Sequence, residues 1–309
     1  MQADSVDAVV VGAGPAGLSA ALILGRARRT AIVCDDGRPR NARSHALHGF
    51  LTRDGEHPQR LRALAFDELR GYGIEVRAHA VVDAARVGGH FTVHLESEAV
   101  INARALLLAT GVEDDVPAIE GLDSLYGRSV FHCPYCDGWE LRDQPLAAYG
   151  PGTNGYKLAV ALISWSQDVV LFTGGGPPPS RHERATLAAL DIPLRREPIV
   201  RLEGVDGRLE RLILAGGASV SRRALFFKTG VRQRSPLAVR FGCELTPKGV
   251  VRTNRLEGTS VPGLYVAGDA SQDVQLAIVA AAEGAKAGFA IDEYLRARDI
   301  EGRIRQAAA

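Results

Sequence analysis

Short apolar runs alternate along the chain with stretches whose apolar residues recur at helical spacing. The first run covers residues 7–12, a helical stretch follows over residues 18–25, and a second apolar run covers residues 30–34. Runs of this length predict strands, and the order strand, helix, strand predicts a βαβ unit with parallel strands. The chain therefore begins as an α/β protein.

The same order of elements recurs in the middle of the chain. Residues 145–149 and 168–172 predict strands, and residues 156–165 between them predict a helix. Two further apolar runs, residues 105–111 and 225–230, also correspond, because each contains the dipeptide Thr-Gly at its end. The fold class expected from this repeat is α/β, with two Rossmann-like dinucleotide-binding domains.

The end of the chain indicates how the two units are connected. An apolar run over residues 263–269 and a helical pattern over about 273–298 have no counterpart before the second unit. The simplest layout is a discontinuous first domain, residues 1–114 and 246–309, into which a second domain, residues 115–245, is inserted.

Composition narrows the classes of partner. The 309 residues are 46% hydrophobic and 24% charged, with a net charge of +1, so no basic tract predicts nucleic-acid binding. No basic segment followed by an apolar run stands at the beginning, as a secretory signal would require. The longest apolar stretch, residues 158–173, contains Asp168 and is too short to span a bilayer. We expect a cytoplasmic protein with no nucleic-acid or membrane partner.

The turn after the first strand carries a glycine motif. Gly12, Gly14 and Gly17 form G-x-G-x-x-G, and Asp35 ends the next strand about 20 residues on. Glycines let the backbone approach a pyrophosphate at the helix N-terminus, and the carboxylate accepts ribose hydroxyls. The other interpretation is a glycine-rich turn with a solvated Asp. Because strand, motif and acid agree, we expect a dinucleotide site.

A second polar position follows the late strand. Gly268 and Asp269 stand between that strand and the last helix. Asp269 is expected either to cap this helix or to hydrogen-bond the cofactor. If the helix starting near Asp273 points at the cofactor, its dipole favours negative charge there.

The cysteines give the most specific chemical signal. Cys133 and Cys136 form a C-x-x-C pair in a turn-rich polar segment, whereas Cys34 and Cys243 are isolated. A close pair of thiols either closes a redox-active disulfide or shares a metal. A zinc site needs two further ligands of matching type, and no second C-x-x-C exists. Redox chemistry is the favoured interpretation, and Cys34 and Cys243 are expected to be inert thiols.

Two titratable residues flank the pair. His132 precedes Cys133 and either lowers its pKa or is an ordinary surface histidine. Asp137 follows Cys136 and either moves protons to and from a sulfur or serves as a turn residue before Gly138.

Taken together, these motifs resemble the low-molecular-weight thioredoxin reductases and their relatives over nearly the full chain. The resemblance implies a homodimer that binds FAD without a covalent bond. It implies that Cys136 faces the flavin, that Cys133 exchanges with the substrate, and that Asp137 is the acid/base. It also implies a cofactor-binding set made of Gly12, Gly14, Gly17, Asp35, Thr110, Gly111, Gly268, Asp269 and Gln275.

The second glycine motif departs from the family pattern. Gly150, Gly152 and Gly155 are the candidates for holding NAD(P)H, because family members bind NADPH at this turn. Thr173 stands where an acid or a basic residue normally selects the cofactor, and a Gly- and Pro-rich loop follows it. Arg181 lies beyond that loop, as does Arg184. NADP(H) is therefore a doubtful second cofactor.

The segment containing His45 and His48 differs from that of well-known reductases. It resembles the corresponding segment of dithiol oxidases that close disulfides in natural products such as holomycin and gliotoxin. Either histidine serves as a base near the cysteine pair, with His48 our catalytic candidate, or both are ordinary loop residues.

Two enzyme functions remain. The first is reduction of a disulfide on a thioredoxin-like protein or a small molecule, with electrons from NADPH or a protein such as ferredoxin. The second is oxidation of a small dithiol with oxygen as acceptor. A redox sensor is disfavoured because Cys133, Cys136 and Asp137 are all present.

Overall fold

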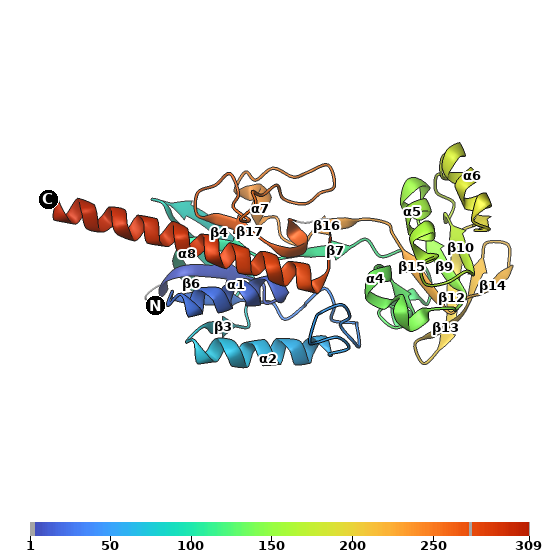
Figure 1. Cartoon of the computed structure of the whole chain (residues 1–309), viewed down its shortest axis with the longest axis horizontal. Coiled ribbons are helices and arrows are strands. Elements are labelled where there is room, and N and C mark those ends of the chain that lie inside the picture. Colours follow the sequence, from blue (N-terminus) through green and yellow to red (C-terminus); the bar gives the residue numbers. More distant parts are fainter. Residues whose placement is uncertain (1–3, 272–273, 309) are drawn as a thin grey trace.

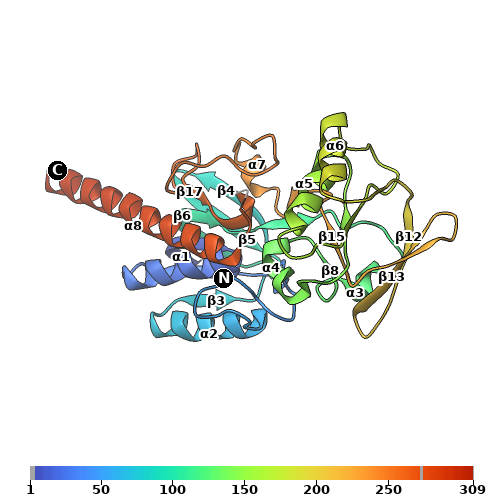
Figure 2. The ribbon, with the colours of Figure 1, turned by 45° about the vertical axis from the view of Figure 1, so that its right-hand side comes forward.

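The computed structural model describes residues 4–271 and 274–308, which form two lobes side by side (Figure 1). Two strands cross between the lobes, β7 (Val112–Asp114) and β16 (Val231–Gln233). They pair with each other in an antiparallel ribbon. The connection between the lobes therefore consists of one narrow two-stranded ribbon (Figures 1 and 2).

A seven-stranded sheet forms the centre of the first lobe. Strands β3, β2, β1, β6 and β17 run parallel, and β4 and β5 form an antiparallel hairpin beside the beginning of β6. The bounds are β1 (Asp4–Val11), β2 (Ala31–Cys34), β3 (Glu75–Arg77), β4 (Val81–Val87), β5 (His90–Leu95), β6 (Val100–Leu108) and β17 (Leu264–Val266).

The parallel direction brings the predicted motifs together. Gly12 follows β1, Asp35 follows β2, Thr110 follows β6 and Gly268 follows β17. Because carboxyl ends of parallel strands meet at one edge, residues far apart in sequence converge there. This edge faces the second lobe (Figure 1).

Helices α1 (Pro15–Arg26) and α8 (Ala277–Ala307) lie side by side on one face of this sheet, with α2 (Pro58–Gly71) beside them (Figure 1). A Cβ at Gly284 would lie 1.9 Å from the Ala16 carbonyl oxygen, so α1 and α8 pack closer than a larger side chain permits. The last helix is shifted from its prediction. It starts at Ala277 and continues to Ala307, whereas Asp273, its expected start, lies outside the described residues.

The second lobe repeats the pattern on a smaller scale. Its parallel sheet has the order β11-β10-β9-β15-β8, and α5 and α6 accompany it. A three-stranded antiparallel sheet, β12-β13-β14, covers one side. The bounds are β8 (Val130–Phe131), β9 (Leu146–Tyr149), β10 (Val169–Phe172), β11 (Leu194–Arg195), β12 (Ile199–Val205), β13 (Arg208–Leu214), β14 (Ser219–Ser221), β15 (Ala224–Phe227), α5 (Gly152–Leu162) and α6 (Arg181–Ala189).

The short elements of the second lobe carry the cysteine motif. They are α3 (Leu122–Leu125), α4 (Pro134–Asp137) and the 3₁₀ turn η1 (Trp139–Leu141). Helix α4 lies on the side of its lobe that faces the first lobe, as both ribbon views show (Figures 1 and 2).

The chain returns to the first lobe through β16. After this strand, α7 (Leu237–Arg240) and Cys243 pack against the outer face of the first sheet, in one core with Phe91 and Val251. We therefore propose to draw the second domain boundary at β16, earlier than residue 246.

Two further observations bear on the sequence analysis. Cys34 and Cys243 are free, buried thiols, as expected of core residues. Over residues 4–271 and 274–308, no helix is long and apolar enough to cross a membrane.

Candidate active site

A cavity of about 430 Å³ lies at the carboxyl edge of the first sheet. Its wall comes from both lobes: Gly12, Asp35 and Asp269 belong to the first, and Cys136 and Asp137 to the second. The volume is in the range of small-molecule and cofactor sites. The cavity thus joins the glycine motif to the cysteine motif.

The turn after β1 is shaped for close approach of a ligand. Gly12 has φ +104°, and a Cβ there would lie 2.4 Å from the Ala109 carbonyl oxygen, so the position requires glycine. Gly14 is open, since a Cβ would meet nothing within 4 Å. No side chain caps the start of α1, so its N–H groups can bind a phosphate.

Asp35 lies beside this turn with its carboxylate held in place. Its Oδ1 accepts from the Ala13 N–H at 2.8 Å, and its Oδ2 accepts from Gly37 N–H at 3.0 Å and from Arg62 at 2.6 Å. Arg62, on α2, was not singled out from the sequence. A carboxylate has lone pairs enough for a ribose hydroxyl besides these donors.

The opposite wall comes from the two other predicted cofactor segments. Thr110 and Gly111 follow β6, and Gly268 with Asp269 follows β17; all four line the cavity. Gln275 and the first residue of α8 do so too, and no side chain caps α8. A helix N-terminus therefore faces the cavity, as proposed from the sequence, but it begins at Ala277. Gly17 lies outside this lining and packs against the Gly12 carbonyl.

Cys133 and Cys136 form a disulfide at the start of α4. Cys136 and the adjacent Asp137 line the cavity. Burial, and then the charge of Glu140, raise the pKa of Asp137 to about 7. A carboxyl that titrates near neutrality can both accept and return a proton under ordinary conditions.

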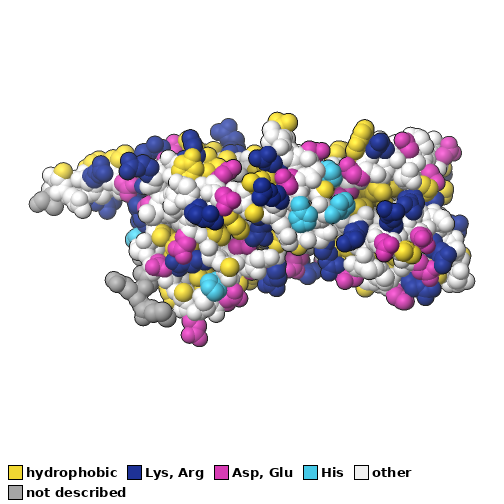
Figure 3. Space-filling model, turned by 90° about the horizontal axis from the view of Figure 1, so that it is seen from below, with side chains coloured by type: hydrophobic (Ala, Val, Ile, Leu, Met, Phe, Trp, Pro, Cys, Tyr) yellow, Lys and Arg dark blue, Asp and Glu magenta, His cyan; other side chains and the backbone are white. Residues whose placement is uncertain are grey.

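The three histidines near the pair have different surroundings. His48 lines the cavity, with Nε2 3.6 Å from Glu140 and Nδ1 3.7 Å from Asp54. His45 lies 3.3 Å from the Gly127 carbonyl oxygen of the second lobe. His132 is partly buried, and burial lowers its pKa. Histidine side chains gather where the lobes meet (Figure 3).

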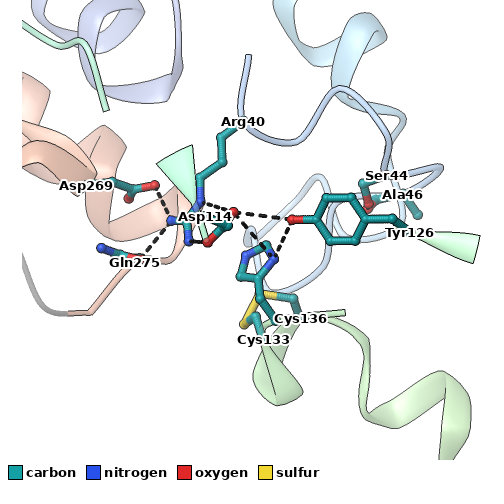
Figure 4. The surroundings of a disulfide bond; sticks show 10 residues. Arg40, Ser44, Ala46, Asp114, Tyr126, Cys133, Cys136, Asp269 and Gln275 are labelled. Atoms are coloured by element: carbon teal, nitrogen blue, oxygen red, sulfur yellow. Dashed lines mark hydrogen bonds and ion pairs between the residues drawn. A yellow bond between two sulfur atoms is a disulfide. The ribbon is translucent and has the colours of Figure 1, made fainter. Parts of the chain in front are cut away.

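Arg40 is the main site residue that sequence reasoning missed. Its side chain is 16% exposed and donates to Asp114 at both carboxylate oxygens. It also donates to Asp269 and to Gln275, each at 2.8 Å (Figure 4). Asp114 in turn lies near Tyr126 and His132 of the second lobe. Arg40 lies in a loop without a recognisable motif, so no sequence signal pointed to its role.

The second glycine turn makes contacts with the loop that follows β10 and with α6. The Gly152 N–H donates to the Pro177 carbonyl oxygen at 2.7 Å. The Glu183 carboxylate, which accepts from the Ser180 N–H, also hydrogen-bonds Thr153 in the first turn of α5. Arg184, a residue beyond the Gly- and Pro-rich loop, donates to the Pro179 carbonyl oxygen at 2.6 Å.

Comparison with known proteins decides the family. The chain matches the model of the pyridine nucleotide-disulphide oxidoreductases over residues 6–284, which spans both lobes and the cysteine pair. The chain belongs to this family. It is an FAD-dependent thiol–disulfide oxidoreductase of the thioredoxin reductase type, and NAD(P)H is a candidate second cofactor. The family, fold class and flavin expected from the sequence are confirmed.

Individual relatives support the same family. Thioredoxin reductase tcpT of Claviceps purpurea is 34% identical, over 85% of this chain and 86% of that protein. The crystal structure of HlmI is 37% identical, covers 98% of this chain and 96% of its own, and superposes with a TM-score of 0.95. The atypical thioredoxin reductase TRi of Desulfovibrio vulgaris Hildenborough is 26% identical and covers 94% of this chain and 98% of its own, with a TM-score of 0.53.

Proposed function

We propose that Cys136 is the sulfur on the flavin side and Cys133 the sulfur that exchanges with the substrate. One observation carries this assignment. Cys136, but not Cys133, lines the cavity that also contains the Gly12–Gly14 turn and Asp269. A sulfur in that wall is next to whatever the dinucleotide motif binds.

The chain's groups fit FAD at this place. The open turn at Gly14 and the uncapped start of α1 would hold the pyrophosphate, and Asp35 would accept a ribose hydroxyl. Asp269, Gln275 and the start of α8 would hold the flavin end. When bound, FAD supplies reversible two-electron chemistry.

The residues beside the two sulfurs transfer protons to and from them. Asp137 adjoins Cys136, and with a pKa of about 7 it takes the proton of the Cys136 thiol and returns it later. His48 lines the same cavity wall, with Nε2 3.6 Å from Glu140, and is the candidate for a base near the cysteine pair. Cys133 then attacks, or is attacked by, a sulfur of the substrate through a mixed disulfide.

The substrate of this exchange is a disulfide or dithiol, either on a thioredoxin-like protein or in a small molecule. One observation favours oxidation of a small dithiol as the second candidate function. The second glycine turn hydrogen-bonds Pro177 and has Glu183 at the start of α5, where a nucleotide phosphate would need free donors. With the Gly152 N–H engaged and Glu183 nearby, weak nucleotide binding is expected, so electrons would enter from a dithiol or from a donor protein.

Anaerobic mixing tests both directions. The FAD-loaded protein is mixed with excess NADPH, or with dithiothreitol, while the visible flavin band is followed. Rapid bleaching by NADPH supports the reductase. Bleaching only by the dithiol, with peroxide formed on admitting air, supports the oxidase. Cys136→Ser should lose dithiol-driven bleaching in either case, and retention of the full rate would contradict the assigned roles.

We infer a homodimer from the family resemblance, and the surface of α8 supports it. Phe289, Ile300 and Ile304 are more than half exposed, and the end of α8 projects beyond the sheet (Figure 1). Exposed apolar groups of this size are typical of an interface. Sedimentation equilibrium should give twice the chain mass, and a monomer at micromolar concentration would contradict the inference.

A further inference from the structure

We propose that Asp114 is a positioning residue that holds the second lobe in the orientation in which Cys136 faces the cavity. The contacts of its carboxylate with Arg40, Tyr126 and His132 are called here the Asp114 latch. The inference rests on the proposed function of Cys136, because it concerns how that sulfur is kept in place.

The latch is at the crossing between the lobes. Asp114 is the last residue of β7, one of the two strands that connect them. Arg40 belongs to the first lobe and is anchored there by Asp269 and Gln275 in the cavity wall. The latch therefore ties the crossing strand to the cofactor site.

On the other side, the latch reaches residues of the second lobe. The Tyr126 hydroxyl lies 3.3 Å from the Asp114 carboxylate and 3.3 Å from His132 Nδ1, and His132 Nδ1 lies 3.8 Å from Asp114. His132 directly precedes Cys133. A turn of the second lobe about the ribbon would separate Tyr126 and His132 from Asp114 while Arg40 stayed.

Burial strengthens the contacts of Asp114 relative to contacts at the surface. The Asp114 side chain is 6% exposed. Burial acts to raise its pKa, but the hydrogen bond from Arg40 and the charges of His132 and Arg40 lower it on balance, so the group is ionised. A hydrogen bond to a buried charge is stronger than one to a charge at the surface.

Other contacts between the same loop and the second lobe are more exposed. Arg43 pairs with Asp123 at side-chain exposures of 50% and 88%, and His48 approaches Glu140, which is 40% exposed. Exposed ion pairs contribute little. Asp114 is therefore the most buried of the charged groups in these contacts.

Two solved relatives superpose on this chain to different degrees. HlmI and TRi cover 98% and 94% of this chain, but their TM-scores are 0.95 and 0.53. Similar elements over the same length thus superpose well in one case and poorly in the other. A chain whose lobes are joined by one ribbon needs a specific contact to select an orientation.

Chemical accessibility of Cys136 tests the latch without relying on turnover. In a Cys133→Ser background, with FAD bound, Cys136 is the thiol in the cavity wall, and Cys34 and Cys243 are buried. Adding Tyr126→Phe removes the hydroxyl but keeps the ring. We expect its reaction with a bulky maleimide to become about tenfold faster, as loss of a hydrogen bond to a charge predicts.

Tyr72→Phe is the matched control, since its hydroxyl binds Arg26 at 2.6 Å in the first lobe, away from the latch. With Cys133 restored, Tyr126→Phe should also slow dithiol-driven flavin bleaching severalfold at unchanged melting temperature. Asp114→Asn should act in the same direction.

The latch is refuted if Tyr126→Phe labels no faster than Tyr72→Phe, or if it only lowers the melting temperature. Retained bleaching in Cys136→Ser would instead refute the role of Cys136, so the two failures are distinguishable.

Discussion

The two glycine turns of the molecule have the same backbone plan and opposite surroundings. After β1, the turn opens on a cavity closed by α4 of the other lobe. After β9, the corresponding turn hydrogen-bonds Pro177, and Glu183 contacts the start of α5. The difference teaches that a glycine motif makes a dinucleotide site possible, while the segments packed against it decide whether the site is open.

Two acids, one in the wall of the cavity and one beside the second turn, have pKa values shifted in opposite directions. Burial raises the pKa of Asp137 to about 7, whereas hydrogen bonds, led by the Ser180 N–H, lower the pKa of Glu183. Asp137 is therefore suited to proton transfer, and Glu183 is a permanent negative charge. The charge of Glu183 disfavours a phosphate at the start of α5.

The largest effect is expected at the first turn. Gly12→Ala places a Cβ 2.4 Å from the Ala109 carbonyl oxygen at φ +104°, so the backbone must move at the proposed pyrophosphate site. We expect FAD affinity to fall by more than about 100-fold. Titration of apoprotein with FAD, followed by flavin fluorescence, measures it. Native affinity in Gly12→Ala would mean that FAD does not use this turn.

Asp137 should control the pH dependence of the reaction with dithiols. If its ionised form accepts the thiol proton, the bleaching rate rises as pH increases through about 7. Asp137→Asn should lower the rate about 100-fold and remove this inflection. Stopped-flow bleaching between pH 5 and 9 provides the profile. An unchanged inflection in the variant would assign it to another group.

The raised pKa of Asp137 also makes the free energy of unfolding depend on pH. A carboxyl whose pKa is raised on folding favours the folded state at acidic pH and loses this contribution as pH rises through the folded pKa. The free energy of unfolding should thus decline between about pH 4 and pH 7, and less so in Asp137→Asn. Urea titrations of both proteins at several pH values would reveal a parallel decline if Asp137 were not the cause.

Opening the second turn should have a modest effect. Glu183→Gln removes the negative charge near the start of α5 while keeping a side chain that can cap α6. We expect NADPH-driven bleaching to rise a few-fold from its initial value, as for one charge at a helix N-terminus. Glu203→Gln is the matched control, since this surface carboxylate on β12 pairs with Arg201 and Arg211 instead. A decrease in the rate would mean that Glu183 assists nucleotide binding.

The smallest effect is expected for Gly152→Ala. Its φ of +50° is unfavourable for alanine, but a Cβ would meet nothing within 4 Å, so the cost is about 1 kcal/mol of stability. FAD content and dithiol-driven bleaching should match the parent protein, in contrast to Gly12→Ala. Loss of dithiol activity in this variant would show that the second turn takes part in the reaction.

Sequence reasoning was strongest where a residue type is dictated locally. Gly12 is required by a positive φ and a close carbonyl, and the two cysteines by their C-x-x-C spacing. It was weakest for the hairpin of β4 and β5 and for the sheet of β12, β13 and β14, which the periodicity did not indicate. Residues such as Glu203 and Arg211 pair at the surface, so these strands lack a clean apolar pattern.

By itself, the sequence determined the repeat of two α/β units, the open glycine turn after the first strand, and the cysteine pair with its neighbouring acid. Each follows from short-range backbone geometry or residue spacing. Only the tertiary structure decided that Cys136 lines the cavity beside the first glycine turn, that Arg40 and Asp114 meet at the crossing strand, and that the Pro177 carbonyl accepts a hydrogen bond from the second turn. These depend on contacts between segments distant along the chain, which no local pattern encodes.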